Sequence, residues 1–285
     1  MHFAYSTNLF RSRPLPEAIE AISKAGFCSV EVIADRPHAF PDDLSAARIA
    51  DLNQFLTEKK MRICNLNSAI VTAIPDTYNP SWLEEDWQQR EARIRYTLDC
   101  MRLAAVLGIP SVSTNAGGEI PETMNQNDAF RLLVANTHRV LPLAKKLGVK
   151  LLIEPEPGLL LETSEQTLRF LKELEFHDSL GINFDAGHFF CVGEDPCESW
   201  EKLHCYIAHV HLDDVPASRS HRHVQLGEGA VDIPGLLRRI ESSDYQGFIT
   251  VRVDSYEQKP EEIVTASANY LREKGFLPKR DEGCS

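Results

Sequence analysis

Short apolar runs rich in β-branched residues alternate along the chain with longer segments in which apolar residues recur at helical spacing. The short runs predict strands over residues 2–6, 29–33, 61–67, 111–115, 150–155, 180–185, 207–213 and 248–254. The longer segments predict helices over residues 16–25, 45–60, 84–107, 125–147, 164–174, 198–203, 233–240 and 261–274.

This alternation continues without a linker or an internal repeat, so it predicts a single α/β domain. We expect a closed (β/α)8 TIM barrel over residues 1–275, followed by a flexible C-terminal tail over residues 276–285. An open doubly wound sheet is the alternative. It would rarely need eight parallel strands, and no GxGxxG motif follows the first predicted strand.

Composition narrows the classes of partner. The net charge of −12 opposes binding to nucleic-acid phosphates and to anionic membranes, so we expect neither partner. Seven cysteines without paired spacing and without a CxxC motif argue against a disulfide framework. The N-terminus lacks the pattern of a signal peptide, and no apolar run approaches the roughly 18 residues of a membrane span. These features predict a cytoplasmic protein.

Carboxylates and imidazoles close three successive predicted strands, which end on the same face of a barrel. These groups are Glu154, Glu156, Asp185, His188, His209, His211 and Asp213. Taken singly, each is more often a helix cap, a rim residue or a satisfied core group. Together they would be costly in an apolar barrel unless a cation compensates. The donor types suit Mn, Co, Zn or Mg.

The segments IEPEP, NFDAGHFF, HVHLDD and QLGEG resemble the xylose-isomerase-like TIM-barrel superfamily over essentially the whole chain. That superfamily includes sugar-phosphate isomerases and epimerases, ketose 3-epimerases and endonuclease IV-type repair enzymes. The resemblance implies that Glu154, Asp185 and His211 bind the metal, and that Glu154 also transfers a proton. It further implies a substrate contact for His188, pocket or ligand-orienting roles for Glu156, His209 and Asp213, and a pocket-facing acid at Glu31.

One position departs from the resemblance. The related ketose epimerases have a glutamate where 247-GFITVR-252 places Arg252, and an arginine neither binds a cation nor accepts a proton. Three interpretations stay open. Asp254 supplies the second base, Arg252 binds a carboxylate or phosphate of the substrate, or Arg252 pairs with a pocket acid and weakens the metal site.

The stretch 219-RSHRHVQLGEG-229 resembles a zinc-binding stretch of the repair endonucleases, so His221 and His223 are candidates for a second metal. In the isomerases this loop covers the substrate, which makes Arg222 a candidate contact. Asn65, Asn67 and Asn115 stand where the nucleases have histidines, and Asn67 could instead bind a substrate hydroxyl. Trp82 and Trp87 could form a lid or pack in the core.

The resulting hypothesis is a divalent-metal-dependent isomerase or epimerase of a sugar, sugar acid or related polyol, working through an enediolate. Glu154 would move the proton, helped by Asp254. The alternatives are a metal-dependent lyase or dehydratase of a keto acid, a ligand-binding barrel without activity and, more remotely, an AP-endonuclease-like repair nuclease. The expected partner is a small polar substrate, a sugar or keto acid. A homo-oligomer is compatible with the superfamily.

Overall fold

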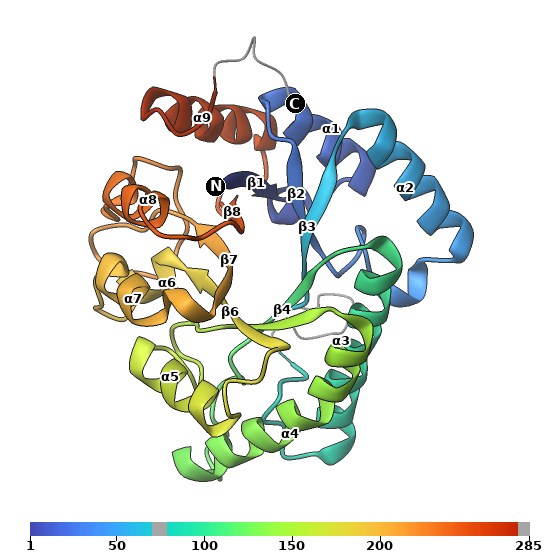
Figure 1. Cartoon of the computed structure of the whole chain (residues 1–285), viewed down its shortest axis with the longest axis vertical. Helices are drawn as coiled ribbons and strands as arrows, with labels where there is room; N and C mark the ends of the chain where they lie inside the picture. Colours follow the sequence, from blue (N-terminus) through green and yellow to red (C-terminus); the bar gives the residue numbers. More distant parts are fainter. Residues whose placement is uncertain (70–78, 279–285) are drawn as a thin grey trace.

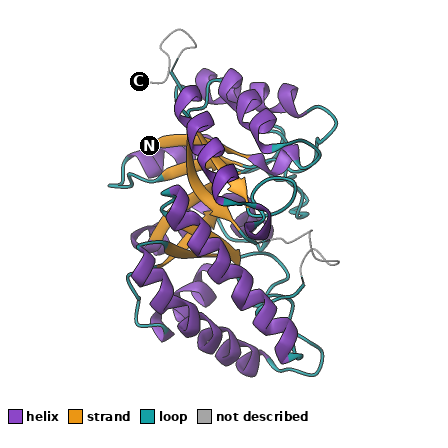
Figure 2. Cartoon of the chain, turned by 90° about the vertical axis from the view of Figure 1, so that its right-hand side faces the viewer, coloured by secondary structure: helices purple, strands orange, loops and turns teal. Residues whose placement is uncertain are grey.

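The computed structural model describes residues 1–69 and 79–278 of the chain. Its parallel strands close a barrel in sequence order from β1 to β8, with β8 paired to β1 (Figure 1). The helices lie outside the strands (Figure 2). The predicted (β/α)8 barrel is therefore confirmed. The part of the predicted tail from residue 279 onward lies outside the described residues.

The strand bounds follow the apolar runs closely. They are β1 His2–Ser6, β2 Ser29–Ile33, β3 Arg62–Asn67, β4 Ser111–Asn115, β5 Lys150–Glu154, β6 Leu180–Asp185, β7 Ile207–Leu212 and β8 Phe248–Val251. Strand β5 ends one residue before its predicted end because Pro155 has no N–H to donate to the sheet. Strand β8 ends three residues before its predicted end, so Arg252 and Asp254 lie in the segment that follows it.

The helices on the outside pack apolar faces against these strands. Their bounds are α1 Leu15–Ala25, α2 Ala46–Lys59, α3 Trp87–Leu107, α4 Gln126–Leu147, α5 Ser164–Glu173, α6 Ala186–Cys191, α7 Pro196–Leu203, α8 Ile233–Glu241 and α9 Pro260–Glu273. Short 3₁₀ helices cover Thr7–Phe10, Pro41–Asp43 and His204–Tyr206. Helix α6 was not predicted, because its six residues are too few to show helical periodicity.

Side-chain caps explain where several helices begin. Helix α3 starts three residues later than predicted because Asp86 accepts the backbone N–H of Gln88 and so caps it. Helix α7 starts two residues earlier than predicted because Asp195 caps it in the same way. In the part of the chain that the structure describes, no helix combines the length and the apolar character needed to cross a membrane.

Candidate active site

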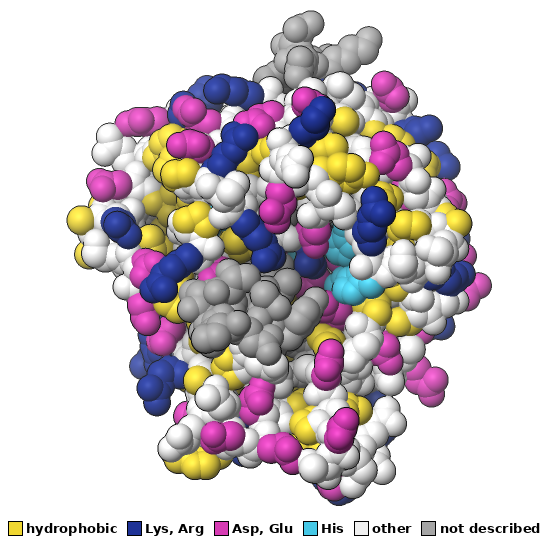
Figure 3. Space-filling model, turned by 180° about the vertical axis from the view of Figure 1, so that it is seen from behind, with side chains coloured by type: hydrophobic (Ala, Val, Ile, Leu, Met, Phe, Trp, Pro, Cys, Tyr) yellow, Lys and Arg dark blue, Asp and Glu magenta, His cyan; other side chains and the backbone are white. Residues whose placement is uncertain are grey.

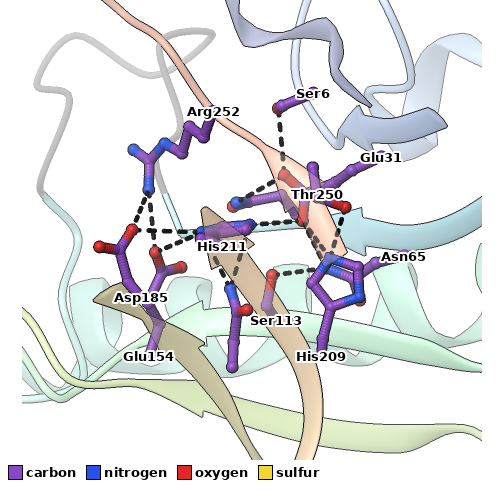
Figure 4. Close-up of polar contacts among 12 residues, drawn as sticks. Ser6, Glu31, Asn65, Ser113, Glu154, Asp185, His209, His211, Thr250 and Arg252 are labelled. Atoms are coloured by element: carbon purple, nitrogen blue, oxygen red, sulfur yellow. Dashed lines mark hydrogen bonds and ion pairs between the residues drawn. The ribbon is translucent and has the colours of Figure 1, made fainter. Parts of the chain in front are cut away.

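Side chains from four strands converge inside the barrel. Glu154 ends β5, Asp185 ends β6, and the register of β6 and β7 pairs Asp185 directly with His211. Glu31 of β2 reaches the other edge of the His211 ring (Figure 4). Closure of the barrel therefore brings together groups as far as 180 residues apart.

The His211 ring has carboxylates on both edges. Its Nδ1 lies 2.9 Å from Glu154 Oε1 and 3.5 Å from Asp185 Oδ2, while its Nε2 lies 2.7 Å from Glu31 Oε2. All four side chains are buried. Burial by itself would lower the pKa of His211, but the charges of Glu31 and Glu154 raise it well above its ordinary value.

Glu154, Asp185 and His211 form a donor set that fits a divalent cation. Each offers one ligand atom, and these atoms lie within 4.8 Å of one another. Glu154 Oε2 and Asp185 Oδ2 are buried and have no hydrogen-bond partner among the described residues. Unpaired oxygens of this kind are costly in a protein interior, and a cation would satisfy both. Two carboxylates and one imidazole suit the metals expected from the sequence.

Asp185 serves the local fold and the site with different oxygens. Its Oδ1 accepts the backbone N–H of His188 at 2.9 Å and so caps α6. The cap leaves Oδ2 facing the cation-compatible set. The sequence DAGH therefore ends a strand, starts a helix and places a carboxylate oxygen in the barrel.

Arg252 lies beside the same carboxylates. Its Nη1 donates to Glu154 Oε1 at 2.9 Å and lies 3.8 Å from Asp185 Oδ2, and its Nη2 lies 3.4 Å from Asp254 Oδ2. Burial opposes the charge of Arg252, but these acids keep its pKa well above the ordinary value. Arg252 thus pairs with pocket acids while Glu154 Oε2 stays unpaired within the described structure.

A hydrogen-bonded polar layer lies around Glu31. Its carboxylate accepts hydrogen bonds from Ser6 Oγ at 3.0 Å and Asn65 Nδ2 at 2.9 Å, and lies 3.3 Å from His209 Nε2. The Glu31 carboxylate is therefore surrounded by hydrogen-bonding groups of the protein, whereas the sequence suggested that it faces the substrate pocket. Asn67 lies at the edge of this layer, where its Nδ2 is 3.5 Å from Glu31 Oε1.

A second cluster lies beside the first and contains three histidines. The Nδ1 of His188 lies 2.8 Å from the carbonyl oxygen of Pro155, and its Nε2 lies 3.0 Å from Nε2 of His221. His223 is buried, and its ring nitrogens have no hydrogen bond among the described residues. Its Nε2 lies 3.3 Å from Asp213 Oδ2. The three histidines also form a set whose donor atoms lie within 4.8 Å of one another. Figure 3 shows histidine side chains at the surface beside acidic and basic ones.

The remaining candidate residues differ in their contacts and in their burial. Asp254 contacts Arg252 and accepts a hydrogen bond from Asn8. Burial would raise the pKa of Asp254, but the nearby charges of Arg252 and His223 lower it to about 2. Glu156 is buried, and burial raises its pKa. Arg222 is exposed on the loop after β7.

The two tryptophans have separate environments. Trp82 is fully buried and donates its indole N–H to Thr114 Oγ1 at 3.0 Å, so it belongs to the core and the lid hypothesis is wrong for it. Trp87, at the start of α3, is 64% exposed.

Two buried groups near the site were not singled out from the sequence as organising residues. Arg93 of α3 donates to the carbonyl oxygens of Ser68 and Ala69 and to Thr114 Oγ1, so it ties α3 to the loop after β3 and to β4. Asp214 accepts backbone N–H groups from the loop that follows β7. The apolar spacing of α3 did not predict that Arg93 is buried and bonds to neighbouring loops. The glycines of LGEG, in contrast, indicate a tight loop and could have pointed to the role of Asp214.

The chain belongs to the xylose isomerase-like TIM barrel family, whose model matches residues 19–274. It is similar to inosose dehydratase of Clostridium perfringens, with 24% identity over 168 residues, which cover 53% of this chain and 56% of that protein. The chain thus spans about half the length of that relative. It is also similar to 2-oxo-tetronate isomerase of Haemophilus influenzae, with 25% identity over 249 residues, which cover 85% of this chain and 89% of that protein.

Solved structures give the same fold. The structure of the IOLI protein with a bound zinc atom has a TM-score of 0.79 and 18% identity, and the match covers 96% of this chain and 98% of that one. The two relatives named above are enzymes, a dehydratase and an isomerase.

Proposed function

We propose that this protein is a metal-dependent enzyme that moves a proton at the carbon next to a carbonyl group of a small polyhydroxylated substrate, as an isomerase or epimerase. The convergence of Glu154, Asp185 and His211 carries this proposal, together with a buried oxygen on each carboxylate that has no hydrogen bond in the described structure. The similarity to 2-oxo-tetronate isomerase, which extends over 85% of the chain, supports an isomerase.

Glu154, Asp185 and His211 would hold the cation. A divalent cation in this set supplies Lewis-acid stabilisation of the negative charge that develops when the substrate loses its proton. Glu31 keeps the His211 ring in place from its far edge, at 2.7 Å. His188 is oriented by the Pro155 carbonyl group, and its Nε2 lies 3.0 Å from Nε2 of His221, so a substrate hydroxyl that bound this nitrogen would take the place of His221.

The proton requires a carboxylate that can both accept and return it. Glu154 Oε1 is occupied by His211 and Arg252, which leaves its Oε2 for the cation or the substrate. Asp254, with a pKa of about 2, is a weak base. Glu156 is buried and has a raised pKa, which brings it closer to the pH at which a carboxyl exchanges protons efficiently. Asp254 is also engaged by Arg252 and Asn8, whereas Glu156 is buried two residues beyond Glu154, so we propose Glu156 ahead of Asp254 as the second proton-transfer group.

A dehydratase is the second candidate, and the similarity to inosose dehydratase favours it. Elimination of water from a hydroxy ketone begins with removal of the same proton and continues with loss of the hydroxyl group one carbon further on. The two candidates share the cation set and the first step, and they differ only in the product.

Elemental analysis of the purified protein tests the cation set. We expect about one Mn, Co, Zn or Mg ion per chain, lost on His211→Ala and on Asp185→Asn. His204→Ala, which alters an exposed histidine at the start of the 3₁₀ helix after α7, is the matched control and should keep the metal. A second metal ion per chain that is lost only on His223→Ala would show that the histidine cluster is a second metal site. If no ion binds even after soaking with divalent metals, the proposal fails.

Activity is measured in deuterated water by NMR with a panel of ketoses and 2-oxo acids. Deuterium at the carbon next to the carbonyl group, with an isomeric product, would support the isomerase or epimerase. Loss of water would support the dehydratase. A metal-loaded protein that exchanges no proton with any member of the panel would count against both.

A further inference from the structure

The guanidinium of Arg252 is removed from water but only partly paired. Its side chain is 7% exposed, yet it makes a single hydrogen bond within the described structure, from Nη1 to Glu154 Oε1. Its Nε is buried without a hydrogen-bond partner there. Because a guanidinium carries five N–H donors, an arrangement this buried leaves most of them unused.

Each acid near Arg252 contacts it through one of the two Nη atoms. Glu154 and Asp185 both face Nη1, and Asp254 faces Nη2 at 3.4 Å. None of these contacts is the parallel two-bond pairing in which arginine binds a carboxylate most strongly. The arrangement therefore keeps the arginine charged and in place without a carboxylate bound to two of its nitrogens at once.

Two of these acids also belong to the proposed cation set. When Glu154 and Asp185 bind a divalent cation, their two negative charges are balanced by it, and they no longer neutralise Arg252. Asp254 then remains, and it is shared with His223 at 3.6 Å and with Asn8. Among the described residues, metal binding thus leaves Asp254 as the one acid within 4 Å of the guanidinium that is not a cation ligand, at 3.4 Å and without a hydrogen bond to it.

A hollow of about 10 Å³, room for about one water molecule, adjoins Arg252. Its lining residues are Asn8, Arg11, Ile33, Asp35, Asn67 and Arg252. Arg11 brings a second guanidinium, whose Nε donates to Asn8 Oδ1 at 2.7 Å. The side chains of Arg11, Asn8, Asp254 and Arg252 therefore form a connected polar chain.

From this juxtaposition we infer that Arg252, with Arg11 behind it, forms a carboxylate subsite, so that the substrate of the proposed enzyme is an acid with its carboxylate next to the reacting carbonyl group. The inference rests on the proposed function. Arg252 contacts the cation-binding acids directly, so a group bound to it lies next to the atoms that face the cation. A planar carboxylate matches one guanidinium fork better than a tetrahedral phosphate does.

Calorimetry with two matched probes tests the subsite. Hydroxypyruvate and 1,3-dihydroxyacetone share a ketone and a hydroxymethyl group, and they differ only in a carboxylate against a second hydroxymethyl group. We expect the metal-loaded protein to bind hydroxypyruvate at least about tenfold more tightly, as for a charge-assisted hydrogen-bonded pair. On Arg252→Gln this preference should vanish while dihydroxyacetone binding changes little. Arg252→Lys should keep part of it.

Arg95→Gln, which removes the same charge from the exposed face of α3, is the control and should keep the preference. Circular dichroism and metal content confirm that each variant is folded and loaded. Equal binding of the two probes by the wild-type protein, a preference that survives in Arg252→Gln, or no hydroxypyruvate binding up to tens of millimolar would overturn the inference. Failure of the proposed function gives a different result. Calorimetry would still show that hydroxypyruvate binding depends on Arg252, but no substrate would take up deuterium in the exchange assay.

Discussion

At the scale of single residues, burial sets the charge state of His38, which lies after β2. Its Nδ1 lies 3.1 Å from Thr7 Oγ1, and its Nε2 lies 3.1 Å from the carbonyl oxygens of Phe10 and Arg13. Burial lowers the pKa of His38 to about 4, although the two carbonyl groups act in the opposite direction. The neutral ring joins the segment after β2 to the segment after β1.

We predict that acidification destabilises the fold through His38. The pKa is about 4 in the folded state and 6.5 when unfolded, so the unfolded state binds more protons between these values. Stability is then unaffected above about pH 7 and falls as the pH drops from about 6.5 to about 4, by about 2 kcal/mol from this residue at about pH 5. Urea unfolding of the wild-type protein and His38→Gln at about pH 7 and about pH 5 measures this loss.

The variant should lose less stability on acidification than the wild-type protein, whatever its stability at neutral pH. His138→Gln, in an exposed ring on α4, should behave as the wild-type protein does. Equal pH dependence in wild-type and His38→Gln would contradict the prediction.

At the scale of elements, one carboxylate organises the loop after β7. Asp214 Oδ2 accepts the backbone N–H groups of Gly227 at 2.8 Å and Gly229 at 2.9 Å, and Oδ1 accepts that of Val231 at 3.1 Å. A Cβ atom on Gly229 would lie 2.1 Å from Asp214 Oδ1, so glycine is required there. The LGEG sequence is thus explained by the approach of the backbone to Asp214, and the loop also carries His223.

We predict that Asp214→Ala destabilises the protein by about 3 kcal/mol or more, because several buried N–H groups lose a charged acceptor. Asp214→Asn, which keeps one acceptor oxygen, should cost less. Denaturant unfolding provides the measurement, and Asp244→Asn, in the exposed turn after α8, is the control. An Asp214→Ala variant as stable as wild type would show that the loop does not depend on this carboxylate.

At the scale of the whole molecule, charge and fold favour a small substrate over a nucleic acid. The net charge of −12 repels a polyanion, and the strand-end histidines found in repair endonucleases are replaced by asparagines at positions 65, 67 and 115. The positive charge near the candidate site comes from buried or half-buried arginines in a small hollow.

We therefore predict that the metal-loaded protein neither binds nor cuts a duplex with an abasic site, even at low salt where phosphate contacts are strongest. Gel-shift and cleavage assays with the abasic duplex and an intact duplex check this. Cleavage that disappears on His223→Ala would instead make the histidine cluster a nuclease centre and would contradict the prediction.

Much of the fold could be predicted from the sequence because strand and helix periodicities are local properties of the chain. The bounds of β1, β2, β4 and β6 agree with the apolar runs. The acidic and imidazole groups at the strand ends were also predictable, since parallel strands in a barrel end on one face. Helix α6 and the early end of β8 were missed, because a six-residue helix has too little periodicity and the departure of the chain after Val251 depends on its neighbours.

The sequence by itself therefore determined the barrel, the order of its elements and the set of residues at its carboxyl end. Only the tertiary structure decided which of these residues touch. It placed Glu31 against His211 from the opposite side of the barrel, and Arg252 against Glu154 across 98 residues. Spacing along the chain gives the face of a strand on which a side chain lies. Which atoms of distant strands come within 3 Å depends on the closure and register of the whole sheet.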